Sequence, residues 1–319
     1  MIVTILLFVV GFVILIKGAD LLVDGASSIA KKFNISDLVI GLTIVSFGTS
    51  APELVINILA SFNGSSDIAI GNVLGSNIAN IFLILGISAL ICNLPLKKST
   101  IFSEIPFTLI AVFLVGFLAN TNLFIEDSTL QISRYEGLVL LVFFLLFLAY
   151  IYTLAKDDKD IFDEVESGLT LTKALIYVVL GVLAMFFGGK WVVDGAIEFA
   201  KYFGLSESFV GLTIISFGTS LPELATSVLA AKKGNSDIAV GNIVGSNIFN
   251  LLWILGISAF IRDLPFPPMS NIDIAVTGFA SVVLILSMTM GKKYSIAKAD
   301  GVIYIIIYFL YLYMIFLRG

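Results

Sequence analysis

Apolar runs long enough to cross a lipid bilayer recur along almost the whole chain. A bilayer core of about 30 Å requires roughly 20 consecutive apolar residues in a helix. Runs of this kind begin at ten places, near Ile2, Leu38, Ile68, Ile105, Tyr135, Leu171, Phe209, Ile238, Ile272 and Val302. The runs are continuous, whereas a membrane β-barrel would show alternating segments of about ten residues. The sequence therefore predicts an all-α polytopic membrane protein with ten transmembrane helices.

Composition agrees with this class and excludes several others. Apolar residues make up 59% of the chain, and the mean hydropathy is +1.07. The first run has neither the basic region nor the small-residue cleavage pattern of a signal peptide, so we expect it to remain as the first helix. The single cysteine, Cys92, excludes an intramolecular disulfide, and without histidine a soft-metal site is not expected. A net charge of -5 offers no basic face for nucleic acid.

The basic residues indicate the orientation in the membrane. With ten spans, one side receives Lys31, Lys32, Lys97, Lys98, Lys156, Lys159, Lys173, Lys232, Lys233, Lys292, Lys293 and Lys298. The other side receives Arg134, Lys201, Arg262 and Arg318. Because lysine and arginine near span ends stay cytoplasmic, we expect a cell-membrane protein with both termini outside and the segment around Lys156 inside.

The chain is internally duplicated. An offset of 170 residues aligns Asp24 with Asp194, Glu53 with Glu223, Asp67 with Asp237 and Pro95 with Pro265. Each copy holds five spans, an odd number, so the second copy must enter the membrane in the opposite sense. Inverted repeats of this kind build alternating access around a central site in transporters.

The expected organisation has two repeats joined by a solvated loop. We expect a first repeat over 1–154, a cytoplasmic loop over 155–169 and a second repeat over 170–319. The loop sequence "KDDKDIFDEVESG" is acidic but lacks the EF-hand spacing and its central glycine, which favours a plain linker, a hinge between halves.

Two blocks match best between the copies. "GLTIVSFGTSAPEL" from Gly41 is repeated as "GLTIISFGTSLPEL" from Gly211, and "DIAIGNVLGSNIANIFLILGISA" as "DIAVGNIVGSNIFNLLWILGISA". Aliphatic residues interchange between the copies, but the polar residues and the proline do not. Thr49, Ser50, Pro52, Glu53, Ser76, Asn77 and Asn80 recur as Thr219, Ser220, Pro222, Glu223, Ser246, Asn247 and Asn250.

The spacing of these residues predicts an oxygen-lined site. In each copy the threonine and glutamate are four residues apart, as are the serine and asparagine, so each pair shares one helical face. Pro52 and Pro222 lack an N–H, and a break there should free backbone carbonyls near Ser46 and Ser216. Hydroxyls, amide oxygens, carbonyls and two carboxylates suit hard cations such as Ca²⁺ and Na⁺.

Each feature also has a structural interpretation. Serine and threonine in membrane helices often bond to a carbonyl, and Gly71 with Gly75, or Gly241 with Gly245, form close-packing GxxxG pairs. The glutamates differ, because an ionisable group in the membrane costs roughly 3 kcal/mol and marks a functional site by default.

Other charged residues near the spans receive a simpler interpretation. The two intramembrane lysines, Lys17 and Lys190, are expected at span ends where they can snorkel. Asp20, Asp24 and Asp194 are expected at the interface rather than as ligands.

The paired blocks "GTSAPEL…GNVLGSNIAN" and "GTSLPEL…GNIVGSNIFN" resemble the α-repeats of the cation/Ca²⁺ exchanger superfamily, in particular its prokaryotic Na⁺/Ca²⁺ exchanger branch. The likeness covers nearly the whole chain. It implies that Glu53 and Glu223 are the central cation ligands. It also implies supporting side-chain ligands and two backbone carbonyls, at Thr49, Ser50, Ser76, Asn80, Thr219, Ser220, Ser246 and Asn250, and at Ser46 and Ser216.

Departures from the family pattern refine the expected function. Asn250 stands where the potassium-dependent branch carries an aspartate, and the histidine typical of the H⁺/Ca²⁺ branch is absent. The loop near Asp157 is too short for a regulatory Ca²⁺-binding domain. We therefore expect exchange that is independent of K⁺. The resemblance implies the family's usual ratio of three Na⁺ for one Ca²⁺, which makes the exchange electrogenic, and Sr²⁺ or Mn²⁺ are further candidate cargo. No cofactor or protein partner is implied, and a monomer in the lipid bilayer is expected.

Three other classes of protein compete with this interpretation. A proton-coupled Ca²⁺ antiporter is the main alternative, because carboxylates can also carry protons. A cation channel could use the same acids, although channels usually surround the pore with several subunits or repeats. An intramembrane aspartyl protease fits poorly, because the acids are glutamates and no G-x-G-D pattern is present. We therefore expect a transporter rather than an enzyme. The resemblance implies that the first and sixth helices move across an eight-helix core. Glycines on these two helices give small faces for close sliding, and simple tight packing explains them equally well.

Overall fold

A computed structural model describes residues 2–96, 103–121, 130–157, 169–202, 216–290 and 294–318. These parts of the chain are mostly helical, and η marks π-helical turns. Up to Asp157 the elements are α1 (Ile2–Phe33), α2 (Asp37–Ile40), η1 (Gly41–Val45), α3 (Ser46–Thr49), α4 (Ala51–Asn63), α5 (Ser66–Ile78), η2 (Ala79–Leu85), α6 (Gly86–Ile91), β1 (Leu94–Pro95), α7 (Ile105–Ala119), β2 (Gln131–Ile132) and α8 (Arg134–Asp157). After it they are α9 (Leu171–Tyr202), α11 (Ser216–Thr219), α12 (Leu221–Lys232), α13 (Ser236–Ile248), η6 (Phe249–Ile254), α14 (Leu255–Ile261), β3 (Leu264–Pro265), α15 (Ser270–Met290), β4 (Ser295–Ile296) and α16 (Lys298–Arg318).

Most of the expected spans are present as long apolar helices. Within the described ranges, seven helices are long and apolar enough to cross a membrane. A further pair, residues 37–49 and 51–63, is long and apolar enough only when taken together, and its two helices are bent by 49° at the break between them. Helix α7 is shorter, at 15 residues. The start expected near Phe209 lies outside the described residues. The chain is thus a multi-span helical membrane protein.

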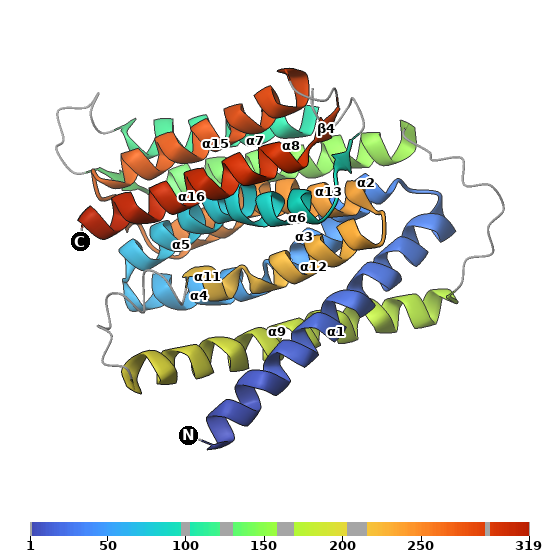
Figure 1. The fold of residues 1–319 in the computed structure, drawn as a ribbon. Helices are drawn as coiled ribbons and strands as arrows, with labels where there is room; N and C mark the ends of the chain where they lie inside the picture. Colours follow the sequence, from blue (N-terminus) through green and yellow to red (C-terminus); the bar gives the residue numbers. More distant parts are fainter. Residues whose placement is uncertain are drawn as a thin grey trace.

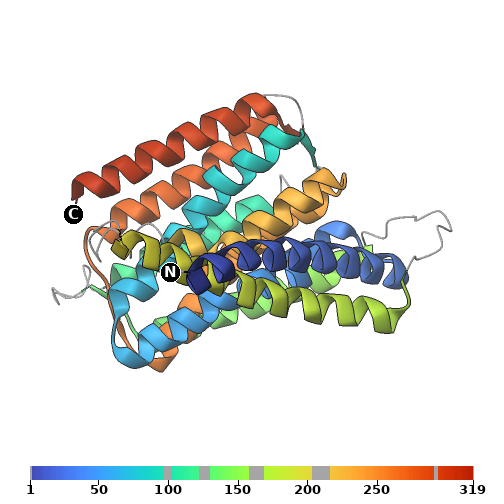
Figure 2. The same ribbon diagram turned by 60° about the horizontal axis from the view of Figure 1, so that its bottom comes forward.

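The two 32-residue helices α1 and α9 pack against each other and lie together on one face of the bundle (Figures 1 and 2). Glycines allow this close approach. A Cβ added at Gly18 would lie 2.8 Å from the carbonyl oxygen of Gly181, and one at Gly188 would lie 2.8 Å from that of Gly11. Gly25 similarly faces the carbonyl of Ala174. The small faces therefore join α1 to α9.

Two short antiparallel strand pairs connect the halves of the sequence. Strand β1 pairs with β4, placing Leu94 opposite Ile296, and β2 pairs with β3, placing Ile132 opposite Leu264. Helices also pack across the halves, α6 on α16 and α8 on α14. The two halves are therefore interleaved.

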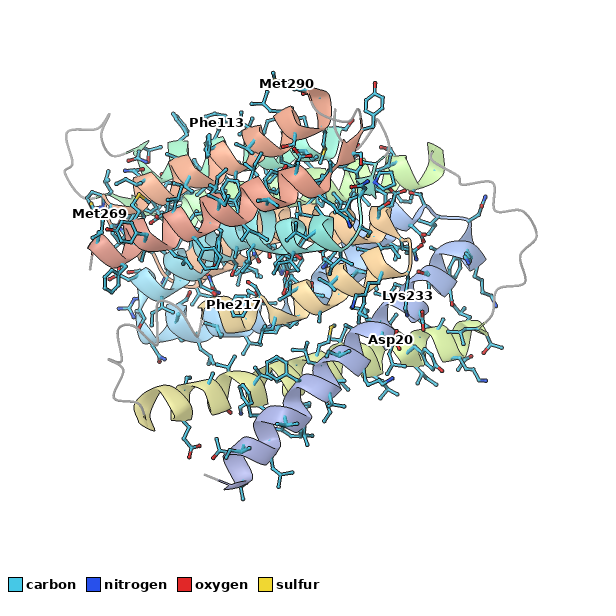
Figure 3. The ribbon with its side chains drawn as sticks, in the orientation of Figure 1. Asp20, Phe113, Phe217, Lys233, Met269 and Met290 are labelled. Atoms are coloured by element: carbon cyan, nitrogen blue, oxygen red, sulfur yellow. The ribbon has the colours of Figure 1, made fainter. Side chains whose placement is uncertain are left out.

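Near one end of the bundle, an ion-pair cluster joins α1 to α12. The ammonium nitrogen of Lys233, just beyond α12, lies 2.6 Å from a carboxylate oxygen of both Asp20 and Asp24 on α1 (Figure 3). The amide of Asn235 also donates to the hydroxyl of Ser27, at 3.0 Å. Asp20 and Asp24 are partly exposed, and their place at the membrane interface stays a prediction. At the matched positions of the other half, Asp20 is replaced by Lys190 and Lys233 by Asn63, so this cluster has no counterpart by sequence.

Candidate functional site

Each half places its glutamate just after a helix break. Helix α3 ends at Thr49 and α4 begins at Ala51, with Pro52 and Glu53 in the first turn of α4. Proline fits the first turn because its missing N–H would have no helical partner there. The carboxylate of Glu53 also gains from the positive end of the helix dipole. The break predicted at Pro52 is confirmed by the 49° bend.

The second half has the same local arrangement. Helix α11 ends at Thr219, Ser220 is the N-cap of α12, and Glu223 lies in the first turn of α12 after Pro222. The backbone dihedrals of Ser50 and Ser220 are nearly equal, with φ of -83° and -86°. The repeated sequence therefore produces a repeated backbone.

The two glutamates are buried and close to each other. Each side chain is 1% exposed. The Glu53 carboxylate lies close enough to that of Glu223 for the two charges to repel. Ser50 Oγ donates to Glu223 Oε1 at 3.0 Å, which brings the second glutamate against the break of the first half. Both carboxylate oxygens of Glu53, and Oε2 of Glu223, are buried without a hydrogen bond in the described part of the chain.

Further oxygens without partners come from the same predicted set. Thirteen buried side-chain nitrogen or oxygen atoms in the described ranges lack a hydrogen bond, and seven belong to predicted ligand residues. The seven are Oε1 and Oε2 of Glu53, Oε2 of Glu223, Oγ of Ser76, Oγ of Ser220 and Oδ1 of Asn80 and Asn250. All seven are oxygens. Buried unpaired oxygens are costly unless something else binds them, so this concentration indicates a cation site.

The asparagines and serines of the second block come from α5 and α13. Ser76 and Ser246 lie within these helices, whereas Asn80 and Asn250 lie in the π-helical turns η2 and η6 that follow. All four side chains are buried. π-Helical turns inside α-helices occur frequently at functional sites.

Hydroxyl groups of the first blocks contact the opposite half. Thr49 Oγ1 lies 3.0 Å from Asn242 Oδ1 and 3.5 Å from Ser246 Oγ. In the matched contact, Thr219 Oγ1 lies 3.4 Å from Asn72 Oδ1. The structure thus brings the helix break of one half against α5 or α13 of the other.

The expected carbonyl at Ser46 is not free. It accepts hydrogen bonds from the Ser50 N–H at 3.0 Å and from Thr49 Oγ1 at 3.2 Å. Pro52 removes the donor that would reach Gly48, four residues earlier, so the proline does not free the Ser46 carbonyl itself, and a ligand role for this carbonyl stays a prediction. The Ser46 hydroxyl bonds back to the Thr43 carbonyl at 3.1 Å. Ser216 begins α11, and its side chain lies outside the described residues.

The structure adds buried polar residues that were not singled out as site residues. Asn72 donates to Asn57 Oδ1 at 2.7 Å, and Asn242 donates to Ser227 Oγ at 3.0 Å. These pairs lie behind Thr219 and Thr49 respectively. Asn72 and Asn242 occupy matched positions in the repeated block, and this recurrence was the available signal.

Within the described residues, no ion pair joins a lysine to either glutamate. Lys17 and Lys190 lie near the middle of the 32-residue helices α1 and α9, rather than at their ends, and both side chains are exposed. A helix of this length is about 48 Å long, more than the bilayer core requires. No group of three or more acidic, cysteine or histidine residues forms a metal cluster in the described ranges. Hydroxyl and amide oxygens must therefore complete any cation site built on the two carboxylates.

One of the two GxxxG glycine pairs packs closely against described residues of the other half. A Cβ at Gly241 would lie 3.0 Å from the Leu38 carbonyl, and one at Gly245 would lie 2.8 Å from Leu42. The packing interpretation is confirmed for this pair. The segment expected to face Gly71 and Gly75, residues 208–216, is largely outside the described residues.

The fold and these buried groups define a polytopic helical membrane protein with two acidic residues at helix breaks in its interior. The sequence profile of the family described as "Sodium/calcium exchanger protein" matches residues 3–153 and 173–317. The chain belongs to this family of exchangers, and it is a transport protein of the antiport type.

Individual relatives match over nearly their full length. CaxA of Alkalimonas amylolytica, which is named as a presumed antiporter, is 40% identical, with 99% of each chain covered. The sodium/calcium exchanger MaX1 of Methanosarcina acetivorans is 33% identical over 98% of each chain. A solved structure of the sodium-calcium exchanger NCX_Mj matches with a TM-score of 0.83 at 30% identity, over 98% of each chain.

Proposed function

We propose that this protein exchanges Na⁺ for Ca²⁺ across the cell membrane by alternating access, with three Na⁺ for each Ca²⁺ and without K⁺. One observation carries the proposal. Glu53 and Glu223, from opposite halves, are buried together with three of their four carboxylate oxygens unpaired in the described part of the chain. Membership of the exchanger family supports the same conclusion.

The proposed ligand set consists of oxygens from both halves. Its members are Glu53, Glu223, Thr49, Thr219, Ser50, Ser220, Ser76, Ser246, Asn80 and Asn250, with backbone contributions near Ser46 and Ser216. Two carboxylates neutralise one Ca²⁺, and the same oxygens can bind Na⁺. The two negative charges of the site cannot neutralise a full set of both ions at once. The ions therefore compete for the site, and this competition couples their transport.

Three-to-one exchange makes use of the membrane potential. One net charge crosses in each cycle, which contributes roughly 2.3 kcal/mol per 100 mV. Three Na⁺ moving down a tenfold gradient add about 1.4 kcal/mol each. The sum of about 6.5 kcal/mol sustains a Ca²⁺ gradient of between roughly four and five decades. Two-to-one exchange would lose the voltage contribution.

The architecture proposed for this cycle is a pair of inverted five-helix repeats, 1–154 and 170–319, joined by the cytoplasmic loop 155–169. Matched helix breaks and matched π-helical turns support it. Ten transmembrane helices place both termini on the same side, which we assign to the outside. Helices α1 and α9 would slide across the remaining eight as a monomer in the bilayer, with no cofactor and no protein partner.

Transport in vesicles tests the proposal. Purified protein in Na⁺-loaded vesicles should take up ⁴⁵Ca²⁺ with the pH gradient collapsed and without K⁺, and uptake should stop when internal Na⁺ is replaced by choline. Since each cycle exports one net positive charge from these vesicles, an inside-positive potential should accelerate uptake. Uptake that persists without Na⁺ but requires a pH gradient would instead establish a proton-coupled antiporter. Flux that needs no counter-ion would indicate a channel.

Site variants connect this transport to the glutamates. Glu53→Gln and Glu223→Gln keep the side-chain shape but remove one charge each, and each should abolish exchange in folded protein. Glu198→Gln is the matched control, because Glu198 lies on the exposed part of α9, where it accepts a hydrogen bond from Thr4 at 2.6 Å. Wild-type exchange in either site variant would contradict the assignment.

A further inference from the structure

Asn77 and Asn247 form a crossed pair where α5 meets α13. Both side chains are buried, and they occupy matched positions in the repeated block. Asn77 Nδ2 donates to the backbone carbonyl of Asn247 at 3.2 Å, and Asn247 Nδ2 donates to the backbone carbonyl of Asn77 at 3.4 Å. Each amide therefore uses its donor on the opposite helix and keeps its oxygen available.

Those two oxygens are taken by the next asparagine of the other half. Asn80 Nδ2 donates to Asn247 Oδ1 at 2.9 Å, and Asn250 Nδ2 donates to Asn77 Oδ1 at 3.0 Å. The amide group of asparagine is planar, and its Nδ2 and Oδ1 atoms lie on opposite sides of the Cβ–Cγ bond axis. Fixing Nδ2 of Asn80 and Asn250 in this way turns their Oδ1 atoms away from the crossed pair. Both Oδ1 atoms are buried without a hydrogen bond in the described part of the protein.

We propose that Asn77 and Asn247 are positioning residues that orient the amides of Asn80 and Asn250, so that oxygen rather than N–H₂ is presented to the transported cation. This inference rests on the proposed function, because it takes Asn80 and Asn250 as ligands. The crossed pair works through these two residues and is not itself a ligand.

The reversed orientation is doubly unfavourable. If the amide of Asn250 turned over, its Oδ1 would face Asn77 Oδ1, and two acceptors would meet without a proton between them. Its N–H₂ group would then point toward the cation, where its positive hydrogens repel the charge. Without Asn77 the first penalty disappears, and the free protein favours the reversed orientation of Asn250, because its N–H₂ group then faces the unpaired oxygens of the site.

The test is Ca²⁺ binding by the purified full-length protein, measured by calorimetry together with the melting temperature. Asn77→Ala should weaken Ca²⁺ binding about tenfold, because about 1.4 kcal/mol of orientation is lost. Asn120→Ala is the matched control. Asn120 and Asn271 exchange reciprocal amide hydrogen bonds of 2.8 and 3.0 Å between α7 and α15, and neither bonds to a proposed ligand. The control should leave Ca²⁺ affinity unchanged.

Rescue distinguishes positioning from general support of the fold. A carboxylate presents an oxygen whichever way it is turned, so Asn77→Ala should cost less than about twofold when Asn250 is already replaced by Asp. Asn80→Asp should not rescue Asn77→Ala, because Asn80 is held by Asn247. The reverse pattern should hold for Asn247→Ala, which Asn80→Asp should rescue and Asn250→Asp should not.

Three results would overturn the inference. The first is an unchanged Ca²⁺ affinity in Asn77→Ala. The second is an equal loss of affinity with or without the aspartate replacements, and the third is equal rescue of Asn77→Ala by Asn80→Asp and by Asn250→Asp. If an alanine variant does not fold, Asn77→Ser and Asn247→Ser test the same pattern, because serine is too short to hold the facing amide. Wild-type protein that binds no Ca²⁺ would refute the proposed function instead, so the two failures can be told apart.

Discussion

Lys233 joins α12 to α1 through two carboxylates, and removing its charge should loosen the contact between these helices. Lys233→Met keeps most of the aliphatic stem and removes only the ammonium group. The side chains of Lys233, Asp20 and Asp24 are 30%, 39% and 49% exposed, so solvent screens the two ion pairs. Partly exposed pairs contribute about 0.2–1 kcal/mol each. Two pairs together give about 1 kcal/mol, which is about a fivefold change in the equilibrium between docked and undocked α1.

Electron–electron distance measurements between spin labels can detect this change. Labels at Lys32→Cys on α1 and Ala299→Cys on α16 sit on exposed side chains, and Cys92→Ser removes the native thiol. The ratio of the population with a long label-to-label distance, in which α1 is undocked, to the population with a short distance should rise about fivefold in Lys233→Met. The control Lys232→Met removes the same charge one residue earlier. Identical distance distributions in Lys233→Met and its parent, or an equal shift in Lys232→Met, would refute the role of the ion pairs.

Further predictions concern pH, packing and one ligand hydroxyl. Partial burial lowers the pKa of Lys233, but hydrogen bonds and attraction from Asp20 and Asp24 outweigh it and raise the pKa above 10.5. Its contribution is therefore complete below 10.5 and lost only as pH rises through the folded pKa, so label distances should not respond to lysine titration between about pH 6 and 9. Gly18→Ala should destabilise the protein by about 1–3 kcal/mol in thermal melts, because the added Cβ would lie 2.8 Å from the Gly181 carbonyl oxygen. The control Gly278→Ala, whose Cβ would lie 3.7 Å from its nearest neighbouring atom, should not destabilise it. Equal melting temperatures of the two variants would contradict this prediction. Thr49→Val removes the hydroxyl but keeps the shape, and should weaken Ca²⁺ binding about threefold to tenfold by calorimetry; unchanged binding would exclude that hydroxyl as a ligand.

The parts of the fold that local physics controls were predictable from the sequence. Apolar run length located most spans, since each run must satisfy its own backbone in lipid. Pro52 and Pro222 marked the helix breaks because a missing N–H acts at a fixed distance along the chain. Glu53 and Glu223 were recognisable as site candidates because a carboxylate inside a membrane segment costs free energy and is usually present for a function.

The parts that depend on contacts between the halves were not predictable in this way. The four-residue spacing of Ser76 with Asn80 assumes α-helical geometry, but Asn80 lies in a π-helical turn, whose wider winding changes the direction of the side chain. The hydrogen bonds of Asn72 and Asn242 to threonines 147 and 193 residues away require knowledge of which helices meet. A sequence pattern contains no information on these distances.

The Ser46 carbonyl shows a smaller limit of the same kind. A proline removes one backbone N–H donor, and the carbonyl that loses its hydrogen bond is the one four residues earlier in the helix. The alternative partners, here the Ser50 amide and the Thr49 hydroxyl, depend on how the chain turns after the break. That turn is only visible in the structure.

The glycines between α1 and α9 have a consequence for ion leakage. These helices belong to opposite halves, yet Gly11, Gly18 and Gly25 meet α9 at intervals of seven residues along their shared length. Backbones in such close contact cannot shift independently without opening voids or colliding. If their movement exposes the buried acids, the entrance on one side must close as the entrance on the other side opens. A continuous water path through the protein would then be prevented by the geometry of a single rigid pair, without any separate device to time the two events.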